Sequence, residues 1–110
     1  VDEYVSDPLC GFLFTVAGFM DLSQLTIQCN EDRWFNNVAK DKPVLLMSGD
    51  MDPVGNYGKG VKEVYQKLLD TGHKNVTLKL YPEARHEILN EINKQEVYDD
   101  LDKWIKENVL

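Results

Sequence analysis

Residues 76–87 read VTLKLYPEARHE, an alternating apolar run that leads into a polar segment with one histidine, His86. Apolar and polar residues alternate over 76–80, and this alternation is typical of a half-buried β-strand. Residues 43–55 read PVLLMSGDMDPVG, a second strand-like run that ends in an acidic loop. We therefore expect two successive strands, one followed by an acidic loop and the other by a histidine loop.

Helical patterns follow each strand. Apolar residues recur at helical spacing over 57–71, and Gly72 stands where a left-handed residue ends a helix. A last helix is predicted to begin at Asn93, with Glu96 closing a capping box. The apolar stripe of the first helix comprises Val61, Val64, Tyr65, Leu68 and Leu69, and the buried stripe of the second comprises Val97, Leu101, Trp104 and Ile105. Residues 41–110 are thus predicted to form a parallel β-α-β-α unit of the α/β class.

Residues 1–40 have a different character. Asp7 and Pro8 signal a turn or a helix start, and residues 10–25 are apolar on nearly every side. We expect a helix there that must be covered on several sides. A second short element is predicted over 23–30, and a loop or a helical turn over 30–37.

Charge and composition exclude several classes of function. The 110 residues carry 19 Asp and Glu against 12 Lys and Arg, a formal net charge of −7. A surface for nucleic acid needs clustered cations, and anionic membranes are disfavoured for the same reason. The longest apolar run, residues 9–20, is too short to insert stably in a bilayer. A neutral or apolar substrate is easier to accommodate.

No metal or cofactor is expected. Cys10 and Cys29 lack the spacing of a zinc site or of a small disulfide scaffold, so reduced thiols and a cytoplasmic location are the default. The glycine-rich segment 55–60 lacks the spacing of a phosphate-binding loop, and a flexible helix start explains it better.

The two loops bring together the residue types of acyl-transfer chemistry. Loops that leave the carboxyl ends of neighbouring parallel strands meet at one edge, with the strands about 4.8 Å apart. Asp52 could then fix the tautomer of His86, whose other nitrogen would take a proton from a hydroxyl nucleophile. Asp50, two residues away, could be the partner instead, although a structural role in the turn is favoured for it.

These segments resemble a known family. The strand at 43–48, the acidic loop at 49–55 and the histidine loop at 81–91 are similar to the C-terminal part of α/β-hydrolases of the lysophospholipase and monoacylglycerol lipase type, also grouped as serine aminopeptidase-like hydrolases. The resemblance implies that Asp52 is the catalytic acid and His86 the catalytic base of an enzyme that cleaves carboxylic esters. It also implies that residues 1–40 are part of a helical lid.

The chain departs from that family in its nucleophile. None of Ser6, Ser23 and Ser48 lies in a Gly-x-Ser-x-Gly turn. Cys10 precedes the acid, but it lies in an apolar run without elbow glycines, which favours a buried inert thiol. We expect the chain to be the C-terminal piece of a longer lipid or ester hydrolase, inactive by itself. The alternative is a non-catalytic α/β module that binds a partner, or associates with itself through an exposed sheet edge and apolar helices.

Other polar and aromatic residues have ordinary explanations. His73 follows the helix-ending Gly72, where a solvated side chain is expected. Arg85 and Glu87 flank His86 and are interpreted as surface charges or as part of an ion pair that fixes the loop. The stripe of Phe12, Phe14, Phe19 and Met20 fits an acyl-chain pocket and a structural core helix equally well.

Overall fold

The computed structural model describes residues 2–109. By their internal contacts these residues divide into two compact units, one ending at Trp34 and the other beginning at Phe35.

The second unit is an α/β structure. Strand β1 (Val44–Gly49), helix α4 (Lys59–Asp70) and strand β2 (Val76–Tyr81) are followed by the 3-10 turn η1 (Ile88–Asn90) and helix α5 (Lys94–Asn108). The strands are parallel neighbours, with Val44 opposite Val76 and Gly49 opposite Tyr81. The predicted β-α-β-α order and fold class are confirmed, and both polar loops leave the same end of the sheet.

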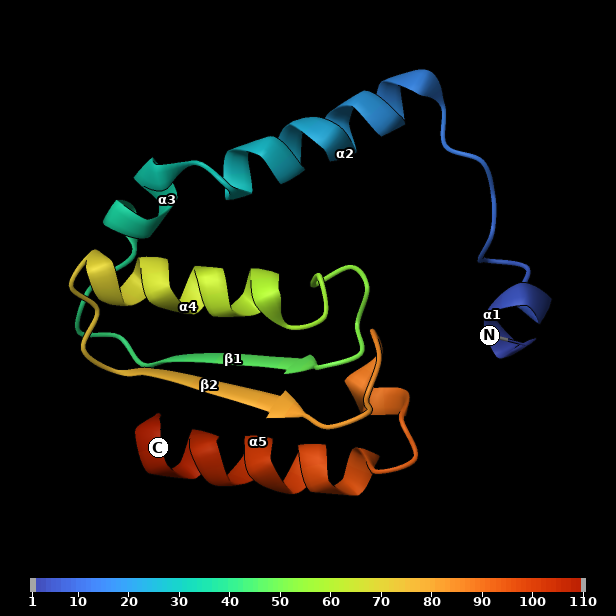
Figure 1. Ribbon diagram of the computed structural model, residues 1–110. Coiled ribbons are helices and arrows are strands. Elements are labelled where there is room, and N and C mark those ends of the chain that lie inside the picture. The colour runs from blue at the N-terminus through green and yellow to red at the C-terminus, as the bar shows by residue number, and fades with distance from the viewer. Residues whose placement is uncertain (1, 110) are drawn as a thin grey trace. The chain divides into compact units, whose positions relative to one another are not determined.

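The two helices cover opposite faces of the sheet (Figure 1). Thr77 and Tyr81 of β2 face α5. The Thr77 hydroxyl accepts the indole N–H of Trp104 at 3.3 Å, and the Tyr81 hydroxyl donates to the Asp100 carboxylate at 3.0 Å. The buried cluster on this side comprises Tyr81, Ala84 and Val97, with Met47 and Ile88 packed against it. Ala84 belongs to the histidine loop, so this loop is anchored in the hydrophobic core.

Helix α4 begins later than its apolar pattern predicts. Asn56 and Tyr57 have φ angles of 50° and 54°, and Gly58 has 78°, so the chain enters the helix only at Lys59. Residues in a left-handed conformation cannot continue a right-handed helix. The predicted start at residue 57 is therefore wrong by two positions.

The end of α4 is a Schellman motif. Gly72 has φ 92°, its N–H donates to Leu69, and the N–H of His73 donates to Leu68. This confirms Gly72 as the predicted helix stop. The prediction that His73 is solvated is wrong, because this motif folds the residue after the glycine back onto the helix, and His73 is buried beside Leu68.

Helix α5 starts after Asn93 as predicted, but without the capping box. The Asn93 side chain does not accept a backbone N–H. Its amide instead donates to the Glu96 carboxylate at 3.2 Å. In the predicted stripe Val97 is buried, Leu101 and Trp104 are half-buried, and Ile105 is exposed, contrary to its prediction.

The first unit is largely helical. It contains α1 (Asp2–Ser6) and α2 (Val16–Cys29), and α3 (Asp32–Asn37) crosses the boundary between the units. The predicted helix start at Cys10 is wrong, because the Thr15 hydroxyl accepts the N–H of Gly18 at 3.1 Å and caps α2 there. The element predicted over 23–30 is the second half of α2, and α3 realises the helical turn predicted over 30–37.

Helix α2 is apolar yet unburied. None of its residues is buried, so the first unit does not by itself supply the expected covering of this helix. Within the part of the chain that the structure describes, no helix has the length and apolar character needed to cross a bilayer.

Candidate active site

The acidic loop and the histidine loop are joined by their backbones. The N–H of Asp50 donates to the carbonyl of Tyr81 at 3.1 Å, and the N–H of Met51 donates to that of Ala84 at 3.0 Å. These bonds extend the pairing of β1 and β2 into the loops. Each loop is therefore held in register with the other beyond the end of the sheet.

Gly49 makes this close approach possible. A Cβ atom placed on Gly49 would lie 2.0 Å from the carbonyl oxygen of Ala84, inside any tolerable contact distance. Any larger residue would push the histidine loop away from β1. The glycine before the acidic loop is thus a steric requirement of the site.

Asp52 and His86 meet at this junction. The Asp52 Oδ2 atom lies 3.1 Å from the Nδ1 atom of His86. The Asp52 side chain is 9% exposed and the His86 side chain 62% exposed. The carboxylate is therefore largely enclosed, and the imidazole extends from it toward solvent.

Hydrogen bonds hold Asp52 in its charged form. The His86 side chain is the largest influence that lowers the pKa of Asp52, and the N–H of Val54, 2.9 Å from Oδ1, lowers it further. Partial burial acts in the opposite direction but does not overcome these bonds. Asp52 is accordingly a carboxylate at neutral pH.

The Asp52 carboxylate determines the tautomer of neutral His86. A carboxylate only accepts hydrogen bonds, so Nδ1 carries the proton and Nε2 keeps its lone pair. Among residues 2–109 no hydrogen bond to Nε2 is found. The exposed face of the imidazole is thus free to accept a proton from a reacting group.

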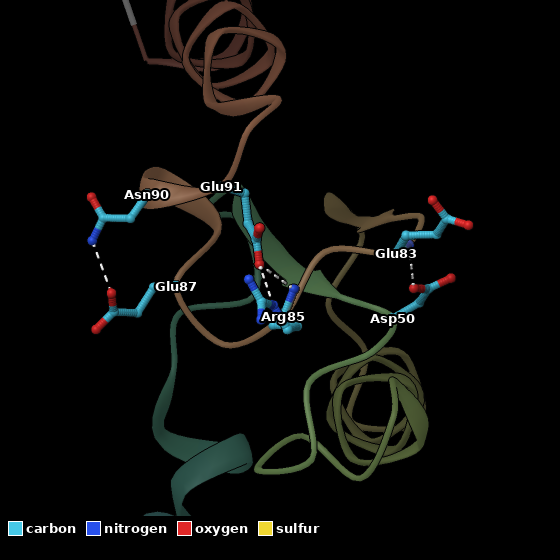
Figure 2. Close-up of polar contacts among 6 residues, drawn as sticks. All are labelled: Asp50, Glu83, Arg85, Glu87, Asn90 and Glu91. Carbon is cyan, nitrogen blue, oxygen red and sulfur yellow. Dashed lines mark hydrogen bonds and ion pairs between the residues drawn. The ribbon is translucent and has the colours of Figure 1, made fainter. Parts of the chain in front are cut away.

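Asp50 has a different partner. Its Oδ1 atom accepts the N–H of Glu83 at 2.7 Å, and Glu83 has a left-handed φ of 61°. The structure pairs His86 with Asp52, and Asp50 acts as a carboxylate that supports the turn. Figure 2 shows Asp50 beside Glu83 on the flank of the histidine loop.

Glu91 is the partner of Arg85. The Glu91 Oε1 atom accepts both the backbone N–H of Arg85 at 2.8 Å and its side-chain Nε–H at 3.2 Å. Glu87 instead accepts the amide of Asn90 at 3.0 Å. Figure 2 shows these two contacts separately. Arg85 belongs to an ion pair, as one interpretation predicts, and the carboxylate of this pair is Glu91.

The remaining sequence candidates have other contacts or surroundings. Ser48 is buried and bonds the carbonyl of Gly49 at 3.2 Å, and Ser23 bonds the carbonyl of Phe19 at 2.8 Å. Cys10 is half-buried, so it is not the fully buried thiol expected. In the described residues no group of three or more metal-ligating side chains is found.

The sequence reasoning missed two residues. From the sequence no role is assigned to Glu91, although a carboxylate shortly after a loop histidine is a candidate hydrogen-bond acceptor for that loop. For His73 a signal was present, because the residue after a helix-ending glycine commonly packs against the last turn.

The parallel β-α-β-α unit, with an aspartate and a histidine at the carboxyl ends of neighbouring strands, has the architecture of an α/β-hydrolase. A family model described as serine aminopeptidase, S33, matches residues 1–93, and the chain belongs to this family.

Two known proteins are similar to the chain. It is 35% identical over 105 residues to the monoglyceride lipase of Saccharomyces cerevisiae, covering 92% of this chain and 32% of the lipase. A crystal structure of a highly thermostable carboxyl esterase from Bacillus coagulans in complex with glycerol superimposes with a TM-score of 0.90 and 30% identity, covering 99% of this chain and 36% of the esterase. The chain spans about a third of the length of each.

Proposed function

We propose that this chain supplies the acid and base of a serine hydrolase that cleaves carboxylic esters, with lysophospholipids or monoacylglycerols as the substrate class. The observation that carries the proposal is the 3.1 Å contact between Asp52 and His86 at adjoining strand ends. The similarity to a monoglyceride lipase and to a carboxyl esterase supports an ester substrate.

In the proposed reaction His86 moves a proton twice. Its Nε2 atom takes the proton of a serine hydroxyl while the serine oxygen forms a bond to the ester carbonyl carbon. Asp52 stabilises the resulting imidazolium. The imidazolium then gives the proton to the leaving alcohol as the ester C–O bond breaks. Water attacks the acyl-enzyme by the same route, and this releases the carboxylic acid and restores the serine.

The serine lies outside these 110 residues in this proposal. The sequence has no Gly-x-Ser-x-Gly turn, and Ser23 and Ser48 bond main-chain carbonyls. The nucleophile and the oxyanion donors would come from another segment of a longer protein. We therefore expect the 110-residue chain alone to hydrolyse no ester.

Residues 1–40 would form part of a lid over an acyl-chain pocket. The ring of Phe14 contacts those of Phe12 and Phe19 edge to face, with centroids 5.6 and 6.4 Å away, respectively. All three are exposed, as is Met20. An exposed aromatic cluster is suited to contact with an acyl chain.

The exposed apolar side chains also lead us to propose that the isolated chain associates with itself. Its sheet has only two strands in the described residues, so each strand has one unpaired edge. Sedimentation of the isolated chain as a compact monomer would contradict this.

We further propose a cytoplasmic location, because Cys10 and Cys29 are free thiols. Imaging a fluorescent fusion of the full-length protein tests it.

The proposed activity is tested with the full-length protein and a soluble ester. His86→Ala is expected to lower kcat by roughly 10⁶-fold and Asp52→Asn by roughly 10⁴-fold, as for other triads. Asp70→Asn, on an exposed turn of α4, is the matched control and should behave as wild type. Rates near wild type in both site variants would overturn the assignment.

A further inference from the structure

We propose that Glu91 and Asp50 are positioning residues that hold the peptides leading to His86, and so place its imidazole against Asp52. This inference rests on the proposed function, in which His86 is the base. Neither carboxylate touches the imidazole. Each accepts a main-chain N–H on the path from β2 to His86.

The need for such support follows from the exposure of His86. Within the described residues its side chain is 62% exposed, so packing by these residues restrains the imidazole very little. The position of the ring therefore depends on the backbone that carries it and on the single bond to Asp52. If the backbone were not held in position, the hydrogen bond to Asp52 would lengthen and Nε2 would point away from the reacting group.

Glu91 holds the peptide that joins Ala84 to Arg85, the residue before His86. The carbonyl of Ala84 accepts the N–H of Met51 at 3.0 Å, and the N–H of Arg85 in the same peptide donates to Glu91 at 2.8 Å. Both polar groups of one peptide plane are thus bonded, one to the acidic loop and one to a side chain. This plane cannot rotate without breaking a bond.

The Glu91 carboxylate suits this task because it is charged and enclosed. Its side chain is 13% exposed, whereas that of Arg85 is 73% exposed. The backbone N–H of Arg85 is the largest influence that lowers the pKa of Glu91, followed by the Arg85 side chain. A bond from an N–H to an ionised acceptor is stronger than a neutral one, and an exposed ion pair contributes little. The backbone contact is therefore the important one.

Asp50 holds the preceding part of the loop. Its carboxylate accepts the N–H of Glu83, the residue with a left-handed φ of 61°. That conformation is unfavourable for a glutamate, and the 2.7 Å bond offsets its cost. Between the two held peptides, Ala84 is buried in the core. The loop is thus fixed at three successive points before His86.

The experiment uses the full-length enzyme and a soluble ester. Glu91→Ala is expected to lower kcat by about tenfold to a hundredfold, with KM changed less than about twofold, because orientation rather than binding is lost. Glu91→Gln, whose amide oxygen can still accept the N–H of Arg85, should recover most of the rate. Asp50→Ala should likewise lower kcat, and Asp50→Asn, whose amide oxygen can still accept the N–H of Glu83, should recover most of the rate.

Two further variants separate the loss of the backbone contact from the loss of a loop carboxylate and from the loss of the Arg85 guanidinium. Glu87→Gln alters a carboxylate of the same loop that accepts only the Asn90 side chain among the contacts in Figure 2, and it should match wild type. Arg85→Met removes the guanidinium but keeps the N–H, so it should lower kcat less than Glu91→Ala. Glu91→Ala within twofold of wild type, while His86→Ala abolishes activity, would overturn the positioning role.

A second measurement tests the positioning role of Glu91 without relying on catalytic activity. The proton on Nδ1 of His86, bonded to Asp52, should give a resolved resonance by NMR in wild type and in Glu91→Gln. In Glu91→Ala this resonance should broaden or disappear. An unchanged resonance in Glu91→Ala would contradict the inference. If His86→Ala retained full activity, the proposed function would fall, and the resonance would still test the placement of His86.

Discussion

Nδ1 of His86 lies 3.1 Å from Oδ2 of Asp52, although the two residues are 34 positions apart in the sequence. Parallel pairing of β1 with β2 places the two loops side by side, and backbone bonds between the loops bring the side chains into contact. The contact fixes the proton of neutral His86 on Nδ1. It therefore leaves the lone pair of Nε2 available to accept a proton.

The two aspartates of the acidic loop should respond differently to the same substitution. Asp52→Asn places an amide against Nδ1 and disfavours the required tautomer, so kcat should fall by about 10⁴-fold. Asp50→Asn keeps an oxygen that can accept the N–H of Glu83, so kcat should fall less than about fivefold. Steady-state kinetics of the full-length protein checks both. Equal losses would show that the roles of the two carboxylates are not distinct.

Gly49→Ala should damage the site more than Gly72→Ala. The new methyl at Gly49 meets the backbone of Ala84 at 2.0 Å, so we expect the free energy of unfolding to fall by about 2 kcal/mol or more, with a large loss of kcat.

Gly72→Ala is the matched control. Nothing lies within 4 Å of a Cβ at Gly72, but its φ of 92° is unfavourable for alanine. Its free energy of unfolding should fall by about 1 kcal/mol with kcat unchanged. Urea denaturation and ester hydrolysis measure both effects. A Gly49→Ala protein with wild-type kcat would contradict the close approach of the two loops.

The stability of the protein should decline in acid partly through Glu91. Its pKa is lower in the folded chain than its ordinary value of 4.5, chiefly because the backbone N–H of Arg85 donates to the carboxylate. The folded state therefore binds this proton less readily than the unfolded state. The contribution is fully present above pH 4.5 and is lost as the pH falls through the lowered pKa.

Glu91→Gln removes this titration. Urea unfolding of the full-length protein at a series of pH values below 4.5 should show a shallower decline for Glu91→Gln than for wild type. Asp52 contributes in the same direction, since its pKa is lowered by the His86 side chain, and Asp52→Asn should also flatten the decline. Parallel curves for wild type and Glu91→Gln would rule out a coupling between this carboxylate and folding.

Tyr81→Phe should test the attachment of α5 to the sheet without touching the site. The buried Tyr81 donates to Asp100 at 3.0 Å, and Lys79 also pairs with Asp100 at 3.0 Å. Loss of the hydroxyl should lower the free energy of unfolding by about 1 kcal/mol. Tyr98→Phe, which removes a more exposed bond to the carbonyl of Leu89, should cost less. Chemical denaturation provides the values, and a larger loss in Tyr98→Phe would contradict this ranking.

The sequence predicted the elements of the second unit because their signals are local. Alternation over 76–80, the apolar stripe of α4 and the left-handed position of Gly72 each depend on nearby residues. Parallel pairing followed from the order of the elements. The pairing then brought Asp52 to His86.

The parts that sequence reasoning did not reach depend on three-dimensional contacts. Glu91 accepts a main-chain N–H, and a main-chain donor has no signature in a sequence. For Asp50 the sequence favours a structural role in the turn, but it does not identify the N–H of Glu83 as the partner. The start of α2 was misplaced because residues 10–15 are as apolar as the helix, and only the Thr15 cap marks the boundary. For His73 the position after the helix-ending Gly72 predicts a solvated side chain, whereas the Schellman motif buries it.

The central claim is that His86, oriented by Asp52, activates a serine elsewhere in the full-length protein. The most direct measurement is the rate at which a fluorophosphonate probe labels that protein, because labelling reports nucleophile activation whatever the natural ester. We predict stoichiometric labelling of wild type, labelling slowed by at least about 10³-fold in His86→Ala, and none of the 110-residue chain alone. Labelling of His86→Ala at the wild-type rate, or labelling of the isolated chain, would contradict the account.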